Sequence, residues 1–161
     1  MDVHEVAVER VIDAPVGTVW ELITDIALMP RFSSELQRVQ WADGFDAPRI
    51  GARFAGVNRH PSVGEWTTTS TVVEYDRPRI FGWAVGDLPN PAATWQFELT
   101  PFDDVCAVRY TARIGPGPSG VTMLIERQPD RAAQIIADRL GALSAAMAAT
   151  LAGIAGLAQG E

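Results

Sequence analysis

The sequence predicts an α+β protein in which about seven antiparallel strands come before one long C-terminal helix. The first observation is that residues 130–157 repeat their larger apolar side chains in steps of three and four, which draws one stripe along a helix. The second is that seven earlier segments show strand-like alternation or a composition rich in threonine and valine. Because the stripe is narrow and backed by alanines, it needs a curved partner surface, and we expect the sheet to wrap it.

The N-terminal elements are marked by alternation and by proline. Residues 3–12 alternate as a strand that ends at Asp13-Ala14-Pro15. Proline suits the first turn of a helix, which predicts an amphipathic helix over residues 16–23. A second short helix over residues 26–28 ends before Pro30, because the residue that precedes a proline is disfavoured in helical geometry.

Four strands are predicted in the middle of the chain. They cover residues 36–42, 52–60, 65–75 and 79–86. The second of them is the most informative, because Arg53 and Arg59 share one face while Phe54, Asn58 and His60 share the other. We therefore expect the arginine face to be exposed to water and the aromatic face to be turned inward.

Two further strands, residues 93–102 and 105–114, form a predicted hairpin around Asp103-Asp104. Trp95 and Phe97 alternate with polar residues in the first strand, and Tyr110 faces inward in the second. The segment 115–120 then separates sheet from helix. It is rich in glycine and proline, but its prolines lack amide donors and no Lys-Ser or Lys-Thr follows, so we interpret it as a linker and not as a phosphate-binding loop.

The C-terminal helix raises the question of a membrane span. Residues 140–160 carry no charge and are long enough to cross a bilayer. Alanine, glycine, serine and threonine dilute the hydrophobicity, and the larger residues keep to the stripe, which is typical of a core helix. The stripe consists of Ile136, Leu140, Leu143, Met147, Leu151, Ile154 and Ala158. We expect no membrane span.

Length and composition exclude several classes of protein. The 161 residues are a single-domain length, so we expect one domain over residues 1–161. The net charge of -7 and the scattered basic residues argue against a nucleic-acid partner. One cysteine and two histidines give no metal-ligand spacing, and no dinucleotide-binding fingerprint is present, so neither a metal nor a cofactor is expected. The N-terminus has no secretory signal, which predicts a cytoplasmic protein.

The order of elements and several local motifs resemble the START-like helix-grip superfamily (SRPBCC), in particular the polyketide cyclase/dehydrase and lipid-transport family. The motifs are Ile12-Asp13-Ala14-Pro15 followed by Val19-Trp20, Asp25 leading to Met29-Pro30-Arg31-Phe32, Gly51-Ala52-Arg53-Phe54 with Gly56-Val57-Asn58, and Trp66 at the start of the next strand. Phe32 stands where this family often has tryptophan. The resemblance implies a curved antiparallel sheet that grips the last helix, with a cavity between them for an apolar or aromatic ligand.

The inward registers then identify candidate ligand-binding residues. They are Phe54, Asn58, His60, Trp66, Trp83, Trp95, Phe97 and Tyr110 from the strands, with Leu143 and Met147 from the helix. Aromatic residues at strand spacing also pack simply as core, and the sequence does not distinguish a filled interior from a hollow one. The resemblance favours a hollow interior, since ligand pockets are concave and mostly apolar with few polar groups.

Three functions are compatible with these residues. The first is binding of a small hydrophobic or aromatic molecule, such as a lipid or polyketide. The second is a cyclase or dehydrase, in which His60 and Tyr110 are the acid-base groups and Asn58 positions the substrate. The third is an interaction module without a ligand, for example a homodimer, which requires a large exposed apolar patch. The resemblance alone does not choose among them, because one fold supports many functions.

Overall fold

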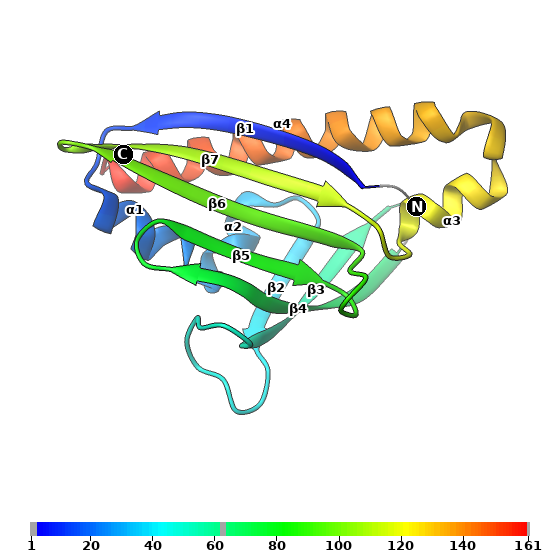
Figure 1. Ribbon diagram of the computed structural model, residues 1–161, viewed down its shortest axis with the longest axis horizontal. Coiled ribbons are helices and arrows are strands. Elements are labelled where there is room, and N and C mark those ends of the chain that lie inside the picture. Colours follow the sequence, from blue (N-terminus) through cyan, green and yellow to red (C-terminus); the bar gives the residue numbers. More distant parts are fainter. Residues whose placement is uncertain (1–2, 62–63, 161) are drawn as a thin grey trace.

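A seven-stranded antiparallel sheet and a long helix that runs along it form the computed structural model, which describes residues 3–61 and 64–160 (Figure 1). The strands are β1 (His4–Ile12), β2 (Leu36–Trp41), β3 (Arg53–His60), β4 (Gly64–Asp76), β5 (Ile80–Val85), β6 (Ala93–Phe102) and β7 (Val105–Ile114). The helices are α1 (Val16–Ile23), the 3-10 turn η1 (Ile26–Leu28), α2 (Met29–Phe32), α3 (Gly120–Arg127), the 3-10 turn η2 (Pro129–Arg131) and α4 (Ala132–Ala158).

The strand order is β1-β7-β6-β5-β4-β3-β2, and every neighbouring pair is antiparallel. The predicted fold class is confirmed, and the hairpin of β6 and β7 has the bounds that the alternation predicts. The long helix differs at its start: η2 occupies residues 129–131 and α4 begins at Ala132. Pro129 stands at the first position of this turn, where its missing amide costs no hydrogen bond, and 3-10 turns are common at the N-terminus of an α-helix.

Part of the predicted linker belongs to a helix. The Ser119 hydroxyl accepts a hydrogen bond from the Val121 amide at 3.2 Å, and the Thr122 hydroxyl accepts one from the Ser119 amide at 2.7 Å. These two bonds form a capping box that starts α3 at Gly120. The capping residues were visible in the sequence, but the glycine and proline content of the segment concealed them.

A β-bulge in β4 changes which side chains face inward. The register with β5 shifts between Val72 and Glu74. Strict alternation from Trp66, Thr68, Ser70 and Val72 would turn Tyr75 outward, but the extra residue of the bulge reverses the faces beyond it. The Tyr75 ring therefore contacts the rings of Trp20 at 5.5 Å and Phe81 at 6.4 Å.

Helix α4 is buried unevenly along its length. Its buried residues are Leu143, Met147, Leu151, Ile154 and Ala155, whereas Ile136 and Leu140 of the predicted stripe are half-buried. The backbone of α4 lies closest to β1 and α1, and α3 and the first turns of α4 lie beyond the end of β1 (Figure 1). The interior is therefore closed around the C-terminal half of α4 and more open around its N-terminal half.

The helix Pro129–Ala158 is long enough to cross a membrane and contains an 18-residue window with a mean hydropathy of 1.8, of which 28% is buried. One such helix is weak grounds for a span, because a core helix of a soluble protein meets the same criteria. Here the large side chains Leu143, Met147 and Leu151 are buried in the same hydrophobic cluster as the sheet. The arrangement is that of a soluble sheet-and-helix fold, as the stripe predicts.

Helix α2 is anchored to α4 by a close aromatic contact. A Cβ atom placed on Gly153 would overlap the ring of Phe32. The ring therefore lies directly on the α4 backbone, an approach that only glycine allows. This contact fixes α2 against the C-terminal half of α4.

Candidate functional site

Aromatic side chains from β3, β5, β6 and β7 form a continuous chain of ring contacts on the inner face of the sheet. Phe54 lies edge-on to Trp83 at 6.2 Å, and Trp83 stacks on Trp95 at 6.3 Å with an interplanar angle of 12°. Trp95 contacts Tyr110 at 5.6 Å, and Tyr110 stacks on Phe97 at 3.9 Å. Five of the predicted ligand-binding residues are thus brought together by the structure.

The strand register produces this chain. Trp83 is the cross-strand neighbour of Trp95, and Phe97 is the cross-strand neighbour of Tyr110. Side chains directly opposite one another in an antiparallel sheet lie about 5 Å apart at their Cβ atoms, which is within reach of ring-to-ring contact. Inward alternation was predictable from the sequence, but pairing the tryptophans required the register.

Aromatic residues outside the predicted set extend the chain in two directions. Trp41 of β2 packs edge-on to Phe54 at 5.6 Å. At the other end, Trp20 of α1 contacts Tyr75 and also Phe81, at 6.4 Å, and the Phe81 ring lies 5.4 Å from that of Trp83. Trp20 is fully buried, and its indole nitrogen has no hydrogen-bond partner among the residues that the structure describes. Trp41 could have been found from its alternation with Val39, whereas the contacts of Trp20 depend on how α1 docks.

The predicted residues fall into a buried group and a half-buried group. Phe54, Trp83, Phe97, Tyr110, Leu143 and Met147 are buried, the last of them 1% exposed. Asn58, His60, Trp66 and Trp95 are half-buried. The first group closes the interior, while the side chains of the second group reach both the interior and the solvent.

Two members of the half-buried group, Asn58 and Trp66, belong to the edge of the sheet that is tied to the N-terminal half of α4 by an ion pair. Glu35, just before β2, is 3.7 Å from Arg139 of α4 in an ion pair. The next residue, Leu36, is the cross-strand neighbour of Asn58, and Asn58 is the cross-strand neighbour of Trp66. The ion pair and the two cross-strand pairs together place Asn58 and Trp66 at the edge of the sheet near the half-buried part of α4. We call this edge, made of Leu36, Asn58, Trp66 and Thr68, the polar rim.

The polar rim carries a pair of neutral polar groups. The side-chain amide of Asn58 donates a hydrogen bond to the Thr68 hydroxyl at 3.3 Å. Gly56 lies between Phe54 and Asn58 on the same face, and a Cβ there would be only 2.9 Å from Leu36 Cδ1 and 3.2 Å from Thr68 Oγ1. The Asn58 carbonyl can still accept a hydrogen bond and the Thr68 hydroxyl can still donate one. The pair is therefore suited to a hydroxyl or a carbonyl.

Burial sets the chemistry of Tyr110 and Cys106. Burial raises the pKa of Tyr110 well above its ordinary value, so its hydroxyl remains protonated and can donate a proton in a hydrogen bond but cannot act as a base. Burial also raises the pKa of the Cys106 thiol. Cys106 is fully buried, so it packs as a small core side chain and is a poor nucleophile.

The structure does not bring His60 and Tyr110 together. Tyr110 lies in the cross-strand row of Phe97 and Phe81, whereas His60 is six residues beyond Phe54 at the end of β3. Strands β7 and β3 are separated by β6, β5 and β4. Neighbouring strands are about 4.8 Å apart and each residue advances about 3.3 Å, so the two side chains belong to opposite ends of the sheet. The predicted acid-base pair is therefore not assembled, because alternation assigns a face but not a position along it.

Stability at alkaline pH tests the environment of Tyr110. The unfolded chain loses the Tyr110 proton above about pH 10, while the folded protein retains it because its pKa is raised. Tyr110 should therefore lower folding stability by about 1.4 kcal/mol per pH unit above that value, and Tyr110→Phe should reduce the measured slope by this amount, while the contribution of Cys106 remains. Urea unfolding between about pH 9.5 and 11.5 measures it, with Tyr75→Phe as the control. Equal slopes in Tyr110→Phe and the parent protein would show that burial does not perturb Tyr110.

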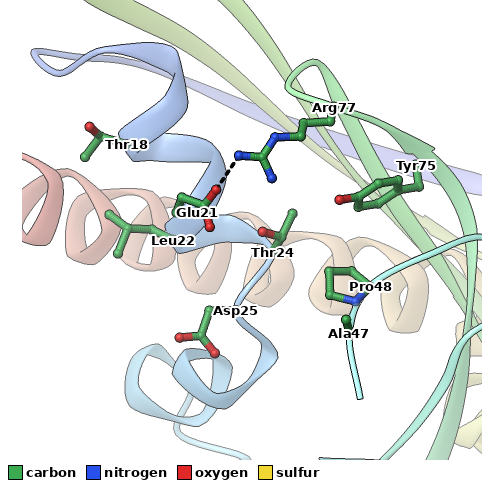
Figure 2. A pocket seen from close by; sticks show the side chains of 9 residues that line it. All are labelled: Thr18, Glu21, Leu22, Thr24, Asp25, Ala47, Pro48, Tyr75 and Arg77. Atoms are coloured by element: carbon green, nitrogen blue, oxygen red, sulfur yellow. Dashed lines mark hydrogen bonds and ion pairs between the residues drawn. The ribbon is translucent and has the colours of Figure 1, made fainter. Parts of the chain in front are cut away.

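A surface groove of about 750 Å³ lies between α1, the loop that contains Ala47 and Pro48, and the end of β4 (Figure 2). It is lined by Thr18, Glu21, Leu22, Thr24, Asp25, Ala47, Pro48, Tyr75 and Arg77. The Arg77 guanidinium pairs with the Glu21 carboxylate at 2.6 Å, and this hydrogen bond raises the Arg77 pKa. The charges of Arg77 and Glu21 therefore cancel each other. The Asp25 carboxylate accepts a hydrogen bond from the Ala27 amide at the start of η1. The groove thus shares Tyr75 with the aromatic chain but contains none of the predicted ligand-binding residues.

Metal-binding residues are not clustered in the parts of the chain that the structure describes. Residues 3–61 and 64–160 contain no group of three or more histidine, cysteine, aspartate or glutamate side chains placed to hold a metal ion. The groups on the inner face that are available for chemistry include the aromatic rings, the protonated phenol of Tyr110, the polar pair of the polar rim, the Ser70 hydroxyl and the His60 imidazole.

An antiparallel sheet that wraps a long C-terminal helix defines the helix-grip class of proteins, and this chain has that architecture. The chain belongs to the polyketide cyclase/dehydrase and lipid transport family, whose model matches residues 3–148. The resemblance inferred from the sequence motifs is confirmed. Comparison with curated proteins found no significant sequence match.

Solved structures support the same fold. A polyketide cyclase-like protein, Cgl2372 of Corynebacterium glutamicum, is 26% identical over 94% of this chain and 88% of its own, with a TM-score of 0.66. The Zhui aromatase/cyclase of Streptomyces sp. R1128 is 14% identical over 98% and 94%, with a TM-score of 0.69. StfQ, a di-domain aromatase/cyclase of the steffimycin biosynthetic pathway, is 20% identical over 98% of this chain and 51% of its own, with a TM-score of 0.69.

Proposed function

We propose that this protein is a single-domain, cytoplasmic binding protein for a small aromatic or otherwise hydrophobic molecule, held between the inner face of the sheet and α4. The observation that carries the proposal is the graded burial of the inner face. Along β6, Leu99 and Phe97 are buried and Trp95 is half-buried, and along β4, Ser70 is buried whereas Thr68 and Trp66 of the polar rim are half-buried. Ligand sites of proteins combine such an apolar wall with a few placed polar groups.

The two parts of the inner face have separate roles in this proposal. The rings of Trp66 and Trp95, which are half-buried, offer flat apolar surface to an incoming ring. Asn58 and Thr68 then orient a hydroxyl or carbonyl of the ligand by accepting and donating hydrogen bonds. The half-buried positions of both groups allow the ligand to enter beside the N-terminal half of α4.

Native mass spectrometry of the freshly purified protein tests the proposal most directly. A bound molecule with an aromatic or apolar skeleton is expected, and its release should change tryptophan fluorescence. Trp66→Ala should weaken rebinding by about tenfold with little loss of stability, because Trp66 is half-buried and its loss removes about 1–3 kcal/mol of apolar contact. Thr67→Ala, the next residue on the outer face, is the matched control. Unchanged affinity in Trp66→Ala would place binding elsewhere.

Met147 tests where along α4 the ligand lies. It is buried at mid-helix, and we expect it to face Trp83 or Trp95 across the interior. Met147→Trp should fill that space, lower ligand affinity by about tenfold and keep the fold, since flexible methionine positions tolerate exchange. Binding is read by isothermal titration and the fold by circular dichroism. Unchanged affinity would show that the stripe faces packed core at this turn and not the ligand.

A cyclase or dehydrase activity is the second candidate, and the family match is the observation that favours it. The active groups would have to be those of the polar rim with His60, because Tyr110 lies at the opposite end of the sheet. Turnover of a linear polyketide mimic to an aromatic product, followed by absorbance, would test this candidate. His60→Gln should abolish turnover if the imidazole is the base, and turnover that survives in both His60→Gln and Asn58→Ala would exclude these two residues.

A further inference from the structure

We propose that the site between sheet and helix selects electrically neutral ligands and rejects carboxylates and phosphates of the same shape. This selectivity rests on the proposed function, because it names the chemical class of ligand for that same site. It follows from where the chain places its charges, which the strand register and the ion pairs define.

The chain contains thirteen arginines and no lysine, so its cationic side chains, apart from any protonated histidine, are all guanidinium groups. On the face of β2–β7 that carries Phe54, Trp83 and Phe97, the register places no arginine, aspartate or glutamate among the described residues. The polar side chains of this face include Asn58, His60, Thr68, Ser70 and Tyr110. The wall therefore offers hydrogen bonds but no fixed positive charge.

The arginines nearest the sheet lie on its outer face or at its edge. Arg109 pairs with Glu9 at 2.6 Å, Arg113 with Glu5 at 2.7 Å and Arg59 with Glu65 at 3.1 Å, all of them exposed pairs. On β1, Arg10 alternates towards the inner side, but it is exposed and lies opposite Val108, at the end away from the polar rim. These guanidinium groups cannot neutralise an anion between sheet and helix.

Arg139 of α4 lies near the polar rim, and it is already paired. Its guanidinium lies 3.7 Å from the Glu35 carboxylate. An anion that used Arg139 would have to displace Glu35 and leave that carboxylate, about one-third exposed, without its partner. A ligand carboxylate that is buried without a cationic partner loses several kcal/mol of hydration free energy. A neutral ester, ketone or phenol can instead form its hydrogen bonds with Asn58 and Thr68. The inner face and the polar rim should therefore bind an uncharged ligand more tightly than an anion of the same shape.

A matched pair of probes tests this selectivity. Methyl 2-naphthoate and 2-naphthoate share one ring system and differ in charge, and both are titrated against tryptophan fluorescence. The ester is expected to bind at least about tenfold more tightly than the acid. The titration is repeated with His60→Gln, because His60 is on the same face and a protonated imidazole would add positive charge. The preference for the ester is expected to persist in that variant.

Two lysine variants provide the decisive comparison. Thr68→Lys places a cation on the inner face and is expected to raise naphthoate affinity about tenfold, whereas Thr67→Lys adds the same charge to the outer face and should not. Asn58→Lys replaces Thr68→Lys if circular dichroism shows that the latter is unfolded. Failure of both probes to bind would overturn the proposed function itself. Equal binding of ester and acid, or equal effects of the two lysines, would overturn the neutral-ligand inference alone.

Discussion

Replacing Trp83 by alanine is expected to lower the free energy of unfolding by about 3–5 kcal/mol, the largest effect that we expect from any single change on the inner face. Trp83 is 6% exposed and contacts the rings of Phe54, Phe81, Trp95 and Phe97. Truncation removes apolar contact with all four rings and leaves a cavity that the rigid sheet cannot close. Urea unfolding followed by circular dichroism measures the loss.

Trp66→Ala is the control for Trp83→Ala, since the two variants delete the same side chain from the same face. Trp66 is half-buried, so its loss should cost about 1 kcal/mol or less in stability while weakening ligand binding. Equal destabilisation by the two variants would contradict the division of the inner face into a closed end and a half-buried rim. A small effect of Trp83→Ala would show that the centre of the aromatic chain is loosely packed.

The second large effect is expected at Gly153, where alanine should destabilise the protein by about 1–3 kcal/mol. Helix propensity alone predicts the opposite, since alanine in place of a helical glycine gains about 0.5–1 kcal/mol. The new methyl group would overlap the Phe32 ring, so either α2 must move away from α4 or the ring must leave its position. Thermal and urea unfolding of the variant measure the net change in the free energy of unfolding, which combines the gain in helix propensity with the cost of the overlap.

Gly141→Ala is the matched control on the same helix. A Cβ at Gly141 meets nothing within 4 Å, so this variant should gain the full propensity term of about 0.5–1 kcal/mol. In a Phe32→Ala background, Gly153→Ala should become neutral or stabilising, which isolates the contact as a double-mutant coupling. Equal stabilisation by Gly153→Ala and Gly141→Ala in the parent protein would show that Phe32 moves aside at no cost.

Most of the elements were predictable because they depend on local patterns. The hairpin of β6 and β7 follows from alternation around Asp103-Asp104, and α4 follows from the spacing of Leu143, Met147 and Leu151. Neither pattern shows how deeply a side chain is buried. Leu140 and Leu143 look equivalent in the stripe, but only Leu143 is buried, because the sheet covers the C-terminal part of the helix.

Part of the candidate site could not be predicted from the sequence, because it depends on a β-bulge and on the register between strands. The bulge in β4 turns Tyr75 inward, and alternation within one strand carries no sign of it. His60 and Tyr110 share the inner face, as predicted, but their cross-strand rows lie at opposite ends of the sheet. A prediction from the sequence can assign a face, whereas the distance between two residues on that face requires the register of every strand between them.

The sequence by itself therefore determined the class of fold, the family resemblance and the aromatic character of the inner face, because these depend on residue type and local period. The tertiary structure decided which rings touch, which end of α4 stays half-buried and which polar groups can act together. Those properties arise from register, bulge and helix docking, which are set by packing between segments far apart in the chain. The C-terminal helix was recognisable from its stripe, but only the sheet around it shows which of its turns are buried and which are half-buried.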